Sequence, residues 1–365
     1  MNVQKLSDDA CLVDMPTKLT DPDEQPLLNA CAPSGRDQMH HIILDFGPVE
    51  HFNGLGASML VKLDALARNR GQMVMASRVN NHYNEVLTLT GLDQRIKTHA
   101  RIEDALSALG IEASDDIQIS PLASSSGDSS NWASPVAKLK APPFPPEAWN
   151  RNVNGRRAVG PVNGFGQLWQ KLYRLRVSDP SITPEQAILV MKENFPSLQP
   201  EFNRFYPSAA GIQPGEIVAI DSSTPGGPVS TGVMVLYADE VSFTFITPQG
   251  HPESGWVTFS SYRSGDRTVV QILGLARAND PVYEAAFRAV GSKIQIKIWT
   301  HVLTSLANHL GVPPDISVEP TCVDRRMQWS EAKNVWYNAQ IRTLLYIPMR
   351  GLGWPQRRRR RRAYA

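Results

Sequence analysis

Two ionisable residues, His251 and Glu253, flank Pro252 in a short segment bounded by Gly250 and Gly255. A histidine with a pKa near neutrality, oriented by a carboxylate, is a workable general acid or base. The pair could therefore serve a hydrolytic or cyclase-like reaction. The same residues could equally close a turn in which both side chains only satisfy backbone donors and acceptors. The sequence leaves both interpretations open.

No other stretch has the residue pattern of a catalytic centre or a cofactor site. The sequence contains no nucleophile elbow, phosphate-binding loop or metal-ligand spacing, so we expect no cofactor and no metal. Cys11, Cys31 and Cys322 lie far apart and form no Cys-x-x-Cys pair. This favours buried free thiols over disulfides or a zinc site.

The length and composition indicate two domains, because 365 residues with 42% hydrophobic content can form two cores. No run of about 18 apolar residues occurs, and Asp8, Asp9 and Asp14 interrupt the region where a signal peptide is apolar. We therefore expect a cytoplasmic protein. The formal net charge is +2, but Arg357 to Arg362 are six consecutive arginines, and without them the chain carries −4.

The first 110 residues alternate between short apolar strands and amphipathic helices, which predicts a sheet with helices packed against it. Asn53 stands where the cap of the second helix belongs. The expected strands are Cys11–Met15, His41–Phe46, Met73–Ser77 and Arg95–His99, and the expected helices are Asp21–Ala32, one starting near Gly54, Asn81–Leu92 and Ile102–Leu109.

Four stretches of this region resemble, in the same order, a STAS domain, the fold shared by anti-sigma factor antagonists and the cytoplasmic tails of sulfate transporters. They are Ile42–Asp45, the loop ending in Asn53–Gly56, Tyr83–Asp93 and Ile102–Leu106. The resemblance covers nearly all of residues 5–110. It implies an α/β domain over residues 1–110 that binds a protein partner.

In that family the loop before the helix binds a kinase that is also the anti-sigma factor, and phosphorylation of a hydroxyl residue in the loop breaks the complex. The phosphate adds about two negative charges. Here His51, Phe52 and Asn53 replace the family's Asp and two hydroxyl residues, so no acceptor remains. The resemblance implies a partner-binding loop, His51 to Gly54, that binds an anti-sigma factor or kinase-like regulator constitutively or serves in docking or dimerisation. Alternatively, Asn53 only caps the helix and Phe52 only packs.

Residues 111–146 are rich in serine, proline and small residues, with Leu122–Ser130 followed by Pro142–Pro146. Such a segment has little apolar area to offset the entropy of ordering. We expect a linker that buries little and whose proline-rich second half is extended and semi-stiff.

Residues 147–346 predict a second domain of strands and helices. Thr183 to Gln186 is a capping box with proline at the first helical position, and Asp280–Pro281 opens one long helix whose apolar residues recur every three or four positions. The expected strands are Gln167–Val177, Glu216–Asp221, Val229–Tyr237, Val241–Thr247, Gly255–Tyr262 and Thr268–Arg277, as an antiparallel meander, and then Val318–Val323.

This order of elements resembles the START-like helix-grip fold of the SRPBCC type, in which a curved sheet wraps a long C-terminal helix around an apolar cavity. The string Thr247–Gly255 is similar to one in a bacterial branch of that superfamily. The fold class is then α/β followed by α+β, and the resemblance implies an apolar ligand. The aromatic residues that could face the cavity, or be plain core, are Trp169, Phe243, Phe245, Trp256, Phe259 and Trp299.

The chain ends in an amphipathic segment and a basic tail. Gln328 to Ile341 places Trp329, Val335 and Trp336 on one stripe, which we expect to dock on the second domain. The arginine run in the tail, residues 347–365, could bind an anionic membrane or nucleic acid through its charge, or could simply be solvated.

Two functions of different classes follow. The first is a non-enzymatic regulatory protein, in which a STAS module for protein interaction is coupled to a START-like domain that binds an apolar small molecule or lipid. The second is a polyketide cyclase-like enzyme with the STAS module as a docking handle. The lack of a dense ionisable cluster in the second domain favours the first, and His251 and Glu253 converging in a cavity would favour the second. A ligand-free scaffold is a third possibility.

Overall fold

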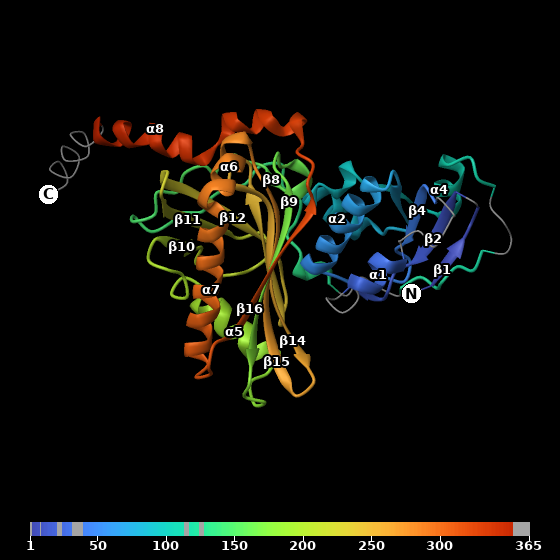
Figure 1. Ribbon diagram of the computed structural model, residues 1–365, viewed down its shortest axis with the longest axis horizontal. Coiled ribbons are helices and arrows are strands. Elements are labelled where there is room, and N and C mark those ends of the chain that lie inside the picture. Colours follow the sequence, from blue (N-terminus) through green and yellow to red (C-terminus); the bar gives the residue numbers. More distant parts are fainter. Residues whose placement is uncertain are drawn as a thin grey trace.

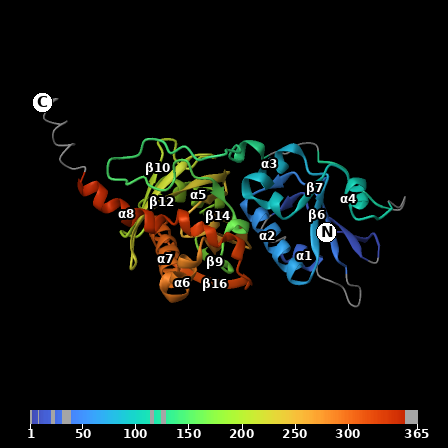
Figure 2. The ribbon, with the colours of Figure 1, turned by 90° about the horizontal axis from the view of Figure 1, so that it is seen from above.

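The computed structural model describes residues 2–7, 9–19, 24–30, 39–112, 117–123 and 128–352. The chain forms two regions that lie side by side in Figure 1 and Figure 2, an N-terminal region coloured mainly blue and a C-terminal region coloured green to red. Cys31 and the six arginines of the tail lie outside the described residues. The expectations made for them stay predictions.

The N-terminal region is the predicted sheet with helices packed against it. Its elements are β1 (Val3–Lys5), β2 (Ala10–Asp14), β3 (Lys18–Leu19), α1 (Glu24–Ala30), β4 (His41–Asp45), β5 (His51–Phe52), α2 (Gly54–Asn69), β6 (Met73–Ser77), α3 (Asn81–Thr90), β7 (Lys97–His99) and α4 (Ile102–Ala108). The main sheet has the order β1-β2-β4-β6-β7, in which only β1 is antiparallel to its neighbour. The sequence analysis missed β1 and the small β3–β5 pair.

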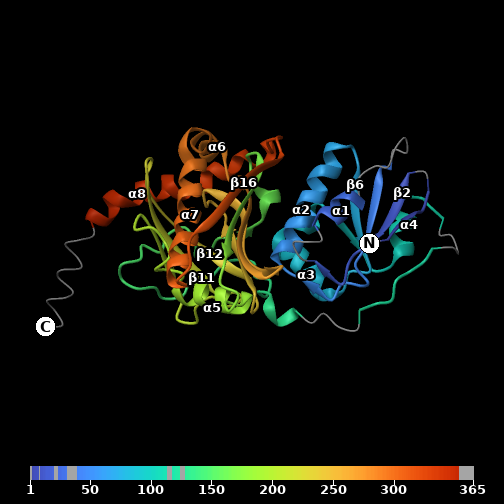
Figure 3. The same ribbon diagram turned by 60° about the horizontal axis from the view of Figure 1, so that its bottom comes forward.

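The helices divide between the two faces of this sheet. Ile102 and Leu106 of α4 pack on one face, against Leu12 and Ile43. Residues of α1, α2 and α3 belong to a larger core on the other face, and Figure 3 shows α2 and α3 on the side toward the C-terminal region. The cap predicted for α2 is confirmed, because the Asn53 side chain accepts hydrogen bonds from the second and third helical N–H groups.

The C-terminal region is built on one antiparallel nine-stranded sheet that curves around a long helix (Figure 1). Its elements are β8 (Ala158–Val159), β9 (Leu168–Val177), α5 (Pro184–Asn194), β10 (Asn203–Pro207), β11 (Ile217–Thr224), β12 (Gly227–Ala238), β13 (Ser242–Pro248), β14 (Glu253–Ser264), β15 (Arg267–Ala278), α6 (Pro281–Ala286), α7 (Ser292–His309) and β16 (Asp315–Asp324). Eight strands follow the order β10-β11-β12-β13-β14-β15-β9-β16, and β8 pairs with β13. The predicted helix-grip arrangement is confirmed.

The long C-terminal helix differs from the prediction in one respect. It starts at the predicted cap Asp280 with Pro281 in its first turn, but a π-helical turn, Phe287–Gly291, separates α6 from α7. A π-helical turn holds an extra residue, so it shifts the face that α7 presents relative to α6, and such turns occur frequently at functional sites.

The curved sheet is buried on both faces. The inner face, toward α5 and α7, carries a core that includes Phe243, Phe245 and Phe259. The outer face carries Ile246 and Trp256, which share a core with α2 and α3 of the N-terminal region. β13 is consequently buried at every position rather than at alternate ones. The N-terminal region therefore covers the outer face of the sheet.

The segment between the two regions contributes to this core, so the prediction that it buries little is wrong at several residues. Trp132, Ala133 and Leu139 are each at most 5% exposed. Trp132 also forms an isolated β-bridge with Tyr237 of β12. The composition is polar on average, but a single tryptophan supplies enough apolar area to anchor the chain between the two regions.

The C-terminal segment differs from the predicted amphipathic helix. Trp329–Tyr337 is a 3₁₀ helix, followed by α8 (Ala339–Leu352). Because a 3₁₀ helix has three residues per turn, the stripe predicted at α-helical spacing does not form, and Trp329 and Trp336 are 71% and 79% exposed. Asn334 and Asn338 are buried instead. No helix of the described residues is long and apolar enough to cross a membrane.

Candidate functional site

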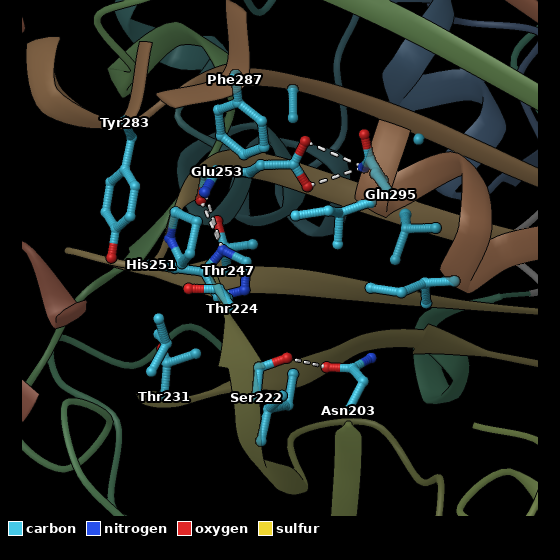
Figure 4. Close-up of a pocket in the computed structure, with 18 of the residues that line it drawn as sticks. Asn203, Ser222, Thr224, Thr231, Thr247, His251, Glu253, Tyr283, Phe287 and Gln295 are labelled. Atoms are coloured by element: carbon cyan, nitrogen blue, oxygen red, sulfur yellow. Dashed lines mark hydrogen bonds between the residues drawn. The ribbon is translucent and has the colours of Figure 1, made fainter. Parts of the chain in front are cut away.

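A cavity of about 250 Å³ lies between the inner face of the curved sheet and the helical segment from α6 to α7. Figure 4 shows two groups of polar side chains on opposite sides of this cavity. One group is His251, Glu253 and Gln295, and the other is Asn203 and Ser222. The wall between them is largely apolar and includes Phe205, Ile220, Val233, Phe245, Ile294 and Ile298.

The cavity exists because the inner face changes from large to small side chains. A Cβ added to Gly274 of β15 would have only the Lys171 carbonyl oxygen within 4 Å, at 3.9 Å. Ala276, two residues further on, also lines the cavity. Two residues earlier on the same strand, Ile272 pairs with Phe259 of β14, and both are fully buried. The sheet is therefore filled at one end and hollow at the other.

The structure brings three of the six predicted aromatic residues to the cavity, Trp169, Phe245 and Trp299. Trp256 borders it only as part of the strand, because its indole lies on the outer face and donates to Ser58 of α2. Phe243 and Phe259 do not line it, because they stack on each other with ring centroids 4.5 Å apart and pack against Phe195 in the filled end of the core.

His251 lines the cavity, and its ring is held by the neighbouring backbone. Nδ1 accepts a hydrogen bond from the Glu253 N–H at 3.0 Å. Nδ1 lies equally close, at 3.0 Å, to the Glu253 carbonyl oxygen, which can only accept, so the two contacts require opposite tautomers of the ring. Burial lowers the pKa of His251 to about 4. At neutral pH the ring is thus uncharged, and its Nδ1 is occupied by the Glu253 backbone.

The Glu253 carboxylate belongs to a separate network at the same end of the cavity. Gln295 Nε2 donates to its two oxygens at 3.0 and 2.9 Å, and Lys171 Nζ donates to Gln295 Oε1. Burial raises the pKa of Glu253, and Lys171 opposes this shift. Burial likewise lowers the pKa of Lys171. His251 and Glu253 therefore converge on one cavity while their side chains make different contacts.

Two buried polar atoms on the cavity wall have no hydrogen-bond partner within the part of the chain that the structure describes. They are Thr231 Oγ1 and Trp299 Nε1. Buried polar groups are nearly always paired, and an indole N–H can only donate. Both atoms are enclosed by the wall itself, so neither is open to a molecule inside the cavity.

A second, more polar hollow of about 240 Å³ shares the residues Trp169, Lys171, Glu253 and Phe287 with the first. Trp169 is 39% exposed, and Phe287 belongs to the π-helical turn. The two hollows therefore adjoin each other between β9 and the helical segment.

The predicted partner-binding loop lies at the junction of the two regions. His51 is exposed and Asn53 caps α2, whereas Phe52 is fully buried and stacks on Trp132 with ring centroids 5.8 Å apart. The buried Asp128 carboxylate accepts from the Phe52 N–H at 2.8 Å, and the Trp132 indole donates to the Phe52 carbonyl at 2.8 Å. The loop is thus held by the segment that connects the two regions.

The first turn of α2 lies directly against the outer face of the sheet. A Cβ added to Gly54 would come within 2.1 Å of Thr244 Oγ1 on β13 and 2.7 Å of Thr258 Oγ1 on β14. The Trp256 indole of β14 donates to Ser58 Oγ of α2 at 2.8 Å. We call the contact of α2 with β13 and β14 the α2–sheet interface.

Polar contacts extend this interface along α2. Lys62, the one polar residue of its apolar stripe, is 3% exposed and donates to Gln170 Oε1 of β9 at 2.6 Å. Further out, Arg95 donates to Gln328 Oε1. A buried lysine that reaches across to another region is specific to this packing, because it requires a partner at that position.

The sequence analysis missed this interface. Ser242 and Thr244 alternate with apolar residues on β13, and Thr258 does so on β14, a pattern typical of a strand face exposed to solvent. All three residues are nevertheless buried. One residue did indicate this interface. Trp256 lies on a strand whose other face is already apolar, and a tryptophan on the second face indicates that this face is buried as well.

Comparison with known proteins gives a family for the N-terminal region. The model of the STAS domain matches residues 14–105. No curated protein matches the chain. The N-terminal region is a STAS domain, and such domains act in regulation through protein interaction.

Solved structures similar to parts of the chain fall into two groups. An anti-sigma factor antagonist of Thermotoga maritima is 21% identical over 29% of this chain and 92% of its own, with a TM-score of 0.26. The di-domain ARO/CYC protein StfQ of the steffimycin pathway is 13% identical over 40% of this chain and 53% of its own, with a TM-score of 0.31. A protein of Thermus thermophilus is 14% identical over 38% of this chain and 96% of its own, with a TM-score of 0.31.

Proposed function

We propose that this protein is a non-enzymatic regulator in which the START-like region binds an apolar small molecule and thereby controls the availability of the STAS domain to a protein partner. One observation carries the proposal. Val257 of β14 lines the cavity, and Trp256, the next residue, holds α2 on the opposite face. The same strand is thus a wall of the cavity and a part of the α2–sheet interface.

The cavity specifies the chemistry of the ligand. Its volume of about 250 Å³ is near the lower end of ligand pockets, which are typically about 300–1,000 Å³. Its wall is mostly apolar, and Gln295 at one end and Asn203 and Ser222 at the other supply polar groups. The ligand is therefore a small apolar molecule with a polar group.

The α2–sheet interface supplies a physical basis for the coupling. A ligand shifts an equilibrium only if it binds one state better than the other. The glycine at position 54 already brings α2 into contact with Thr244 and Thr258. A movement of β13 or β14 toward α2 would therefore create a steric clash. A ligand that displaces the cavity wall therefore favours the state in which the STAS domain is released and its loop is open to a partner.

Native mass spectrometry of the full-length chain, purified from its own host, tests ligand binding. We expect a small apolar mass that is released on denaturation. Gly274→Phe places a ring in the cavity and should abolish the extra mass, whereas Gly274→Ala, which leaves most of the space, should retain it. An apo mass for the wild type, or an unchanged ligand in Gly274→Phe, would contradict the proposal.

A cyclase-like enzyme is the second candidate, and the convergence of His251 and Glu253 on one cavity favours it. The raised pKa of Glu253 suits proton transfer. His251 is neutral, and its Nδ1 is occupied by the Glu253 backbone. This candidate predicts turnover of a polycarbonyl substrate that Glu253→Gln abolishes without loss of binding.

A further inference from the structure

Lys171 is a buried lysine beside the cavity. It lies on β9 and is 7% exposed. Side chains alternate between the two faces of a strand. Leu172, the next residue, belongs to the core of the outer face, and Tyr173 belongs to the core of the inner face. The Lys171 side chain therefore lies on the inner face, where the cavity is.

The space next to this side chain is open because the neighbouring positions of the sheet hold small residues. Lys171 pairs with Gly274 of β15 in the strand register, and Ala276 of β15 pairs with Gly255 of β14. All four residues line the cavity. A molecule in the cavity can therefore approach Lys171 over these small residues.

The Lys171 amine has a neutral partner. Its Nζ donates to Gln295 Oε1 of α7, and no carboxylate of the described residues forms an ion pair with it. Burial lowers the pKa of Lys171, which favours the uncharged amine. An uncharged lysine amine in an apolar site is a nucleophile toward a carbonyl carbon.

Glu253 binds the other end of the same amide. Gln295 Nε2 donates to both of its oxygens, so one side chain holds Glu253 and Lys171 close to each other. Burial raises the pKa of Glu253, which favours the acid form that can donate a proton. A ligand carboxylate on Lys171 would lie next to Glu253, and neighbouring carboxyl groups disfavour each other's ionised form. An uncharged carbonyl group avoids this cost.

We propose that the cavity binds an aldehyde or ketone with an apolar body, which Lys171 holds as an imine. This inference rests on the proposed function, because it names the ligand class of the same cavity. The Lys171 nitrogen forms a bond to the carbonyl carbon, and a C=N bond replaces the C=O bond. Both amine hydrogens leave with the carbonyl oxygen as water.

Glu253 supplies the acid for this step. Its carboxylic acid form donates a proton to the departing hydroxyl group and regains one from the nitrogen. Hydrolysis reverses the sequence, so the ligand is released unchanged and the protein is not consumed.

Reductive trapping of the full-length chain with benzaldehyde tests the proposal. Sodium cyanoborohydride converts an imine to a stable amine, so the mass should increase by one aldehyde less its oxygen. Peptide mapping should find about tenfold or more adduct on Lys171 than on Lys297, an exposed lysine of α7. Glu253→Gln should slow adduct formation about tenfold or more, because the acid is lost.

Two variants of Lys171 separate chemistry from folding. Lys171→Arg keeps a donor for Gln295 but a guanidinium forms no imine, and Lys171→Met removes the charge as well. Both should lose the adduct at this position, whereas Lys297→Arg, the matched control, should retain it. Circular dichroism and the midpoint of urea unfolding establish that the variants are folded.

Two results would overturn the proposal. The wild type forms no adduct on Lys171, or Gly274→Phe forms it as fast as the wild type, although its ring fills the space beside the amine. Native mass spectrometry distinguishes this failure from failure of the proposed function. A released apolar mass in the wild type and in Lys171→Arg alike, without any adduct, would overturn the imine and leave the proposed function standing.

Discussion

The two faces of the curved sheet are both covered, but they are packed in opposite ways. On the outer face, a Cβ at Gly54 would meet Thr244 Oγ1 at 2.1 Å. On the inner face, a Cβ at Gly274 would meet nothing closer than 3.9 Å. Protein interiors are normally close-packed, and space in them costs stability. The difference indicates that the outer face is built for a close contact with α2 and the inner face for a guest molecule.

The largest expected effect is on the pH dependence of stability, through the ionisable groups that line the cavity on the inner face. Since the pKa of His251 is lowered from 6.5 to about 4, between these pH values the unfolded chain binds a proton that the folded chain does not. Stability therefore falls as pH is lowered from 6.5 to 4, by about 3 kcal/mol at most. Urea unfolding across this range should show the loss in the wild type and not in His251→Asn, whose amide oxygen can replace Nδ1.

The raised pKa of Glu253 acts with the opposite sign, because the folded chain then binds the proton more readily and gains stability as pH falls. This contribution is present in both proteins and cancels in their difference. Parallel pH profiles for the wild type and His251→Asn would show that His251 is not held neutral by the inner face.

A smaller effect compares one added methyl group on each face. Gly54→Ala should destabilise the protein by about 1–3 kcal/mol, because the methyl group overpacks the α2–sheet interface. Gly274→Ala should be neutral or stabilise by up to about 1 kcal/mol, because alanine costs less entropy in a strand and the cavity has room. Both values come from urea unfolding. Equal effects of the two substitutions would remove the contrast between the faces.

The sequence predicted the elements better than the packing between them. Asn53, Thr183 and Asp280 each mark a helix start that the structure confirms, because capping depends on residues within one turn. Spacing also predicted the central strands from β11 to β15. In the C-terminal sheet and its long helix, β8, β10 and the π-helical turn were missed, and none of them has a distinct local pattern.

The candidate site depended on contacts that no local pattern contains. Thr244 and Thr258 have the polar character of a solvent-facing side, but they are bonded to each other at 3.0 Å and lie under Gly54. Likewise, Glu253 meets Gln295 only because the sheet curves around α7. His251 and Glu253 could be singled out from sequence, whereas their partners required the fold.

Hydrogen exchange of the α2 amides is the most direct test of the coupling between the two faces. Gly274→Phe fills the cavity, and Gly274→Ala is its matched control. We predict that amides in the first turns of α2 exchange about fivefold or more faster in Gly274→Phe than in Gly274→Ala, while the amides of β2 and β4 exchange equally in both. A fivefold change corresponds to the lower end of typical coupling free energies. Identical exchange in α2 for the two variants would contradict the account, because the cavity and the STAS domain would then be independent.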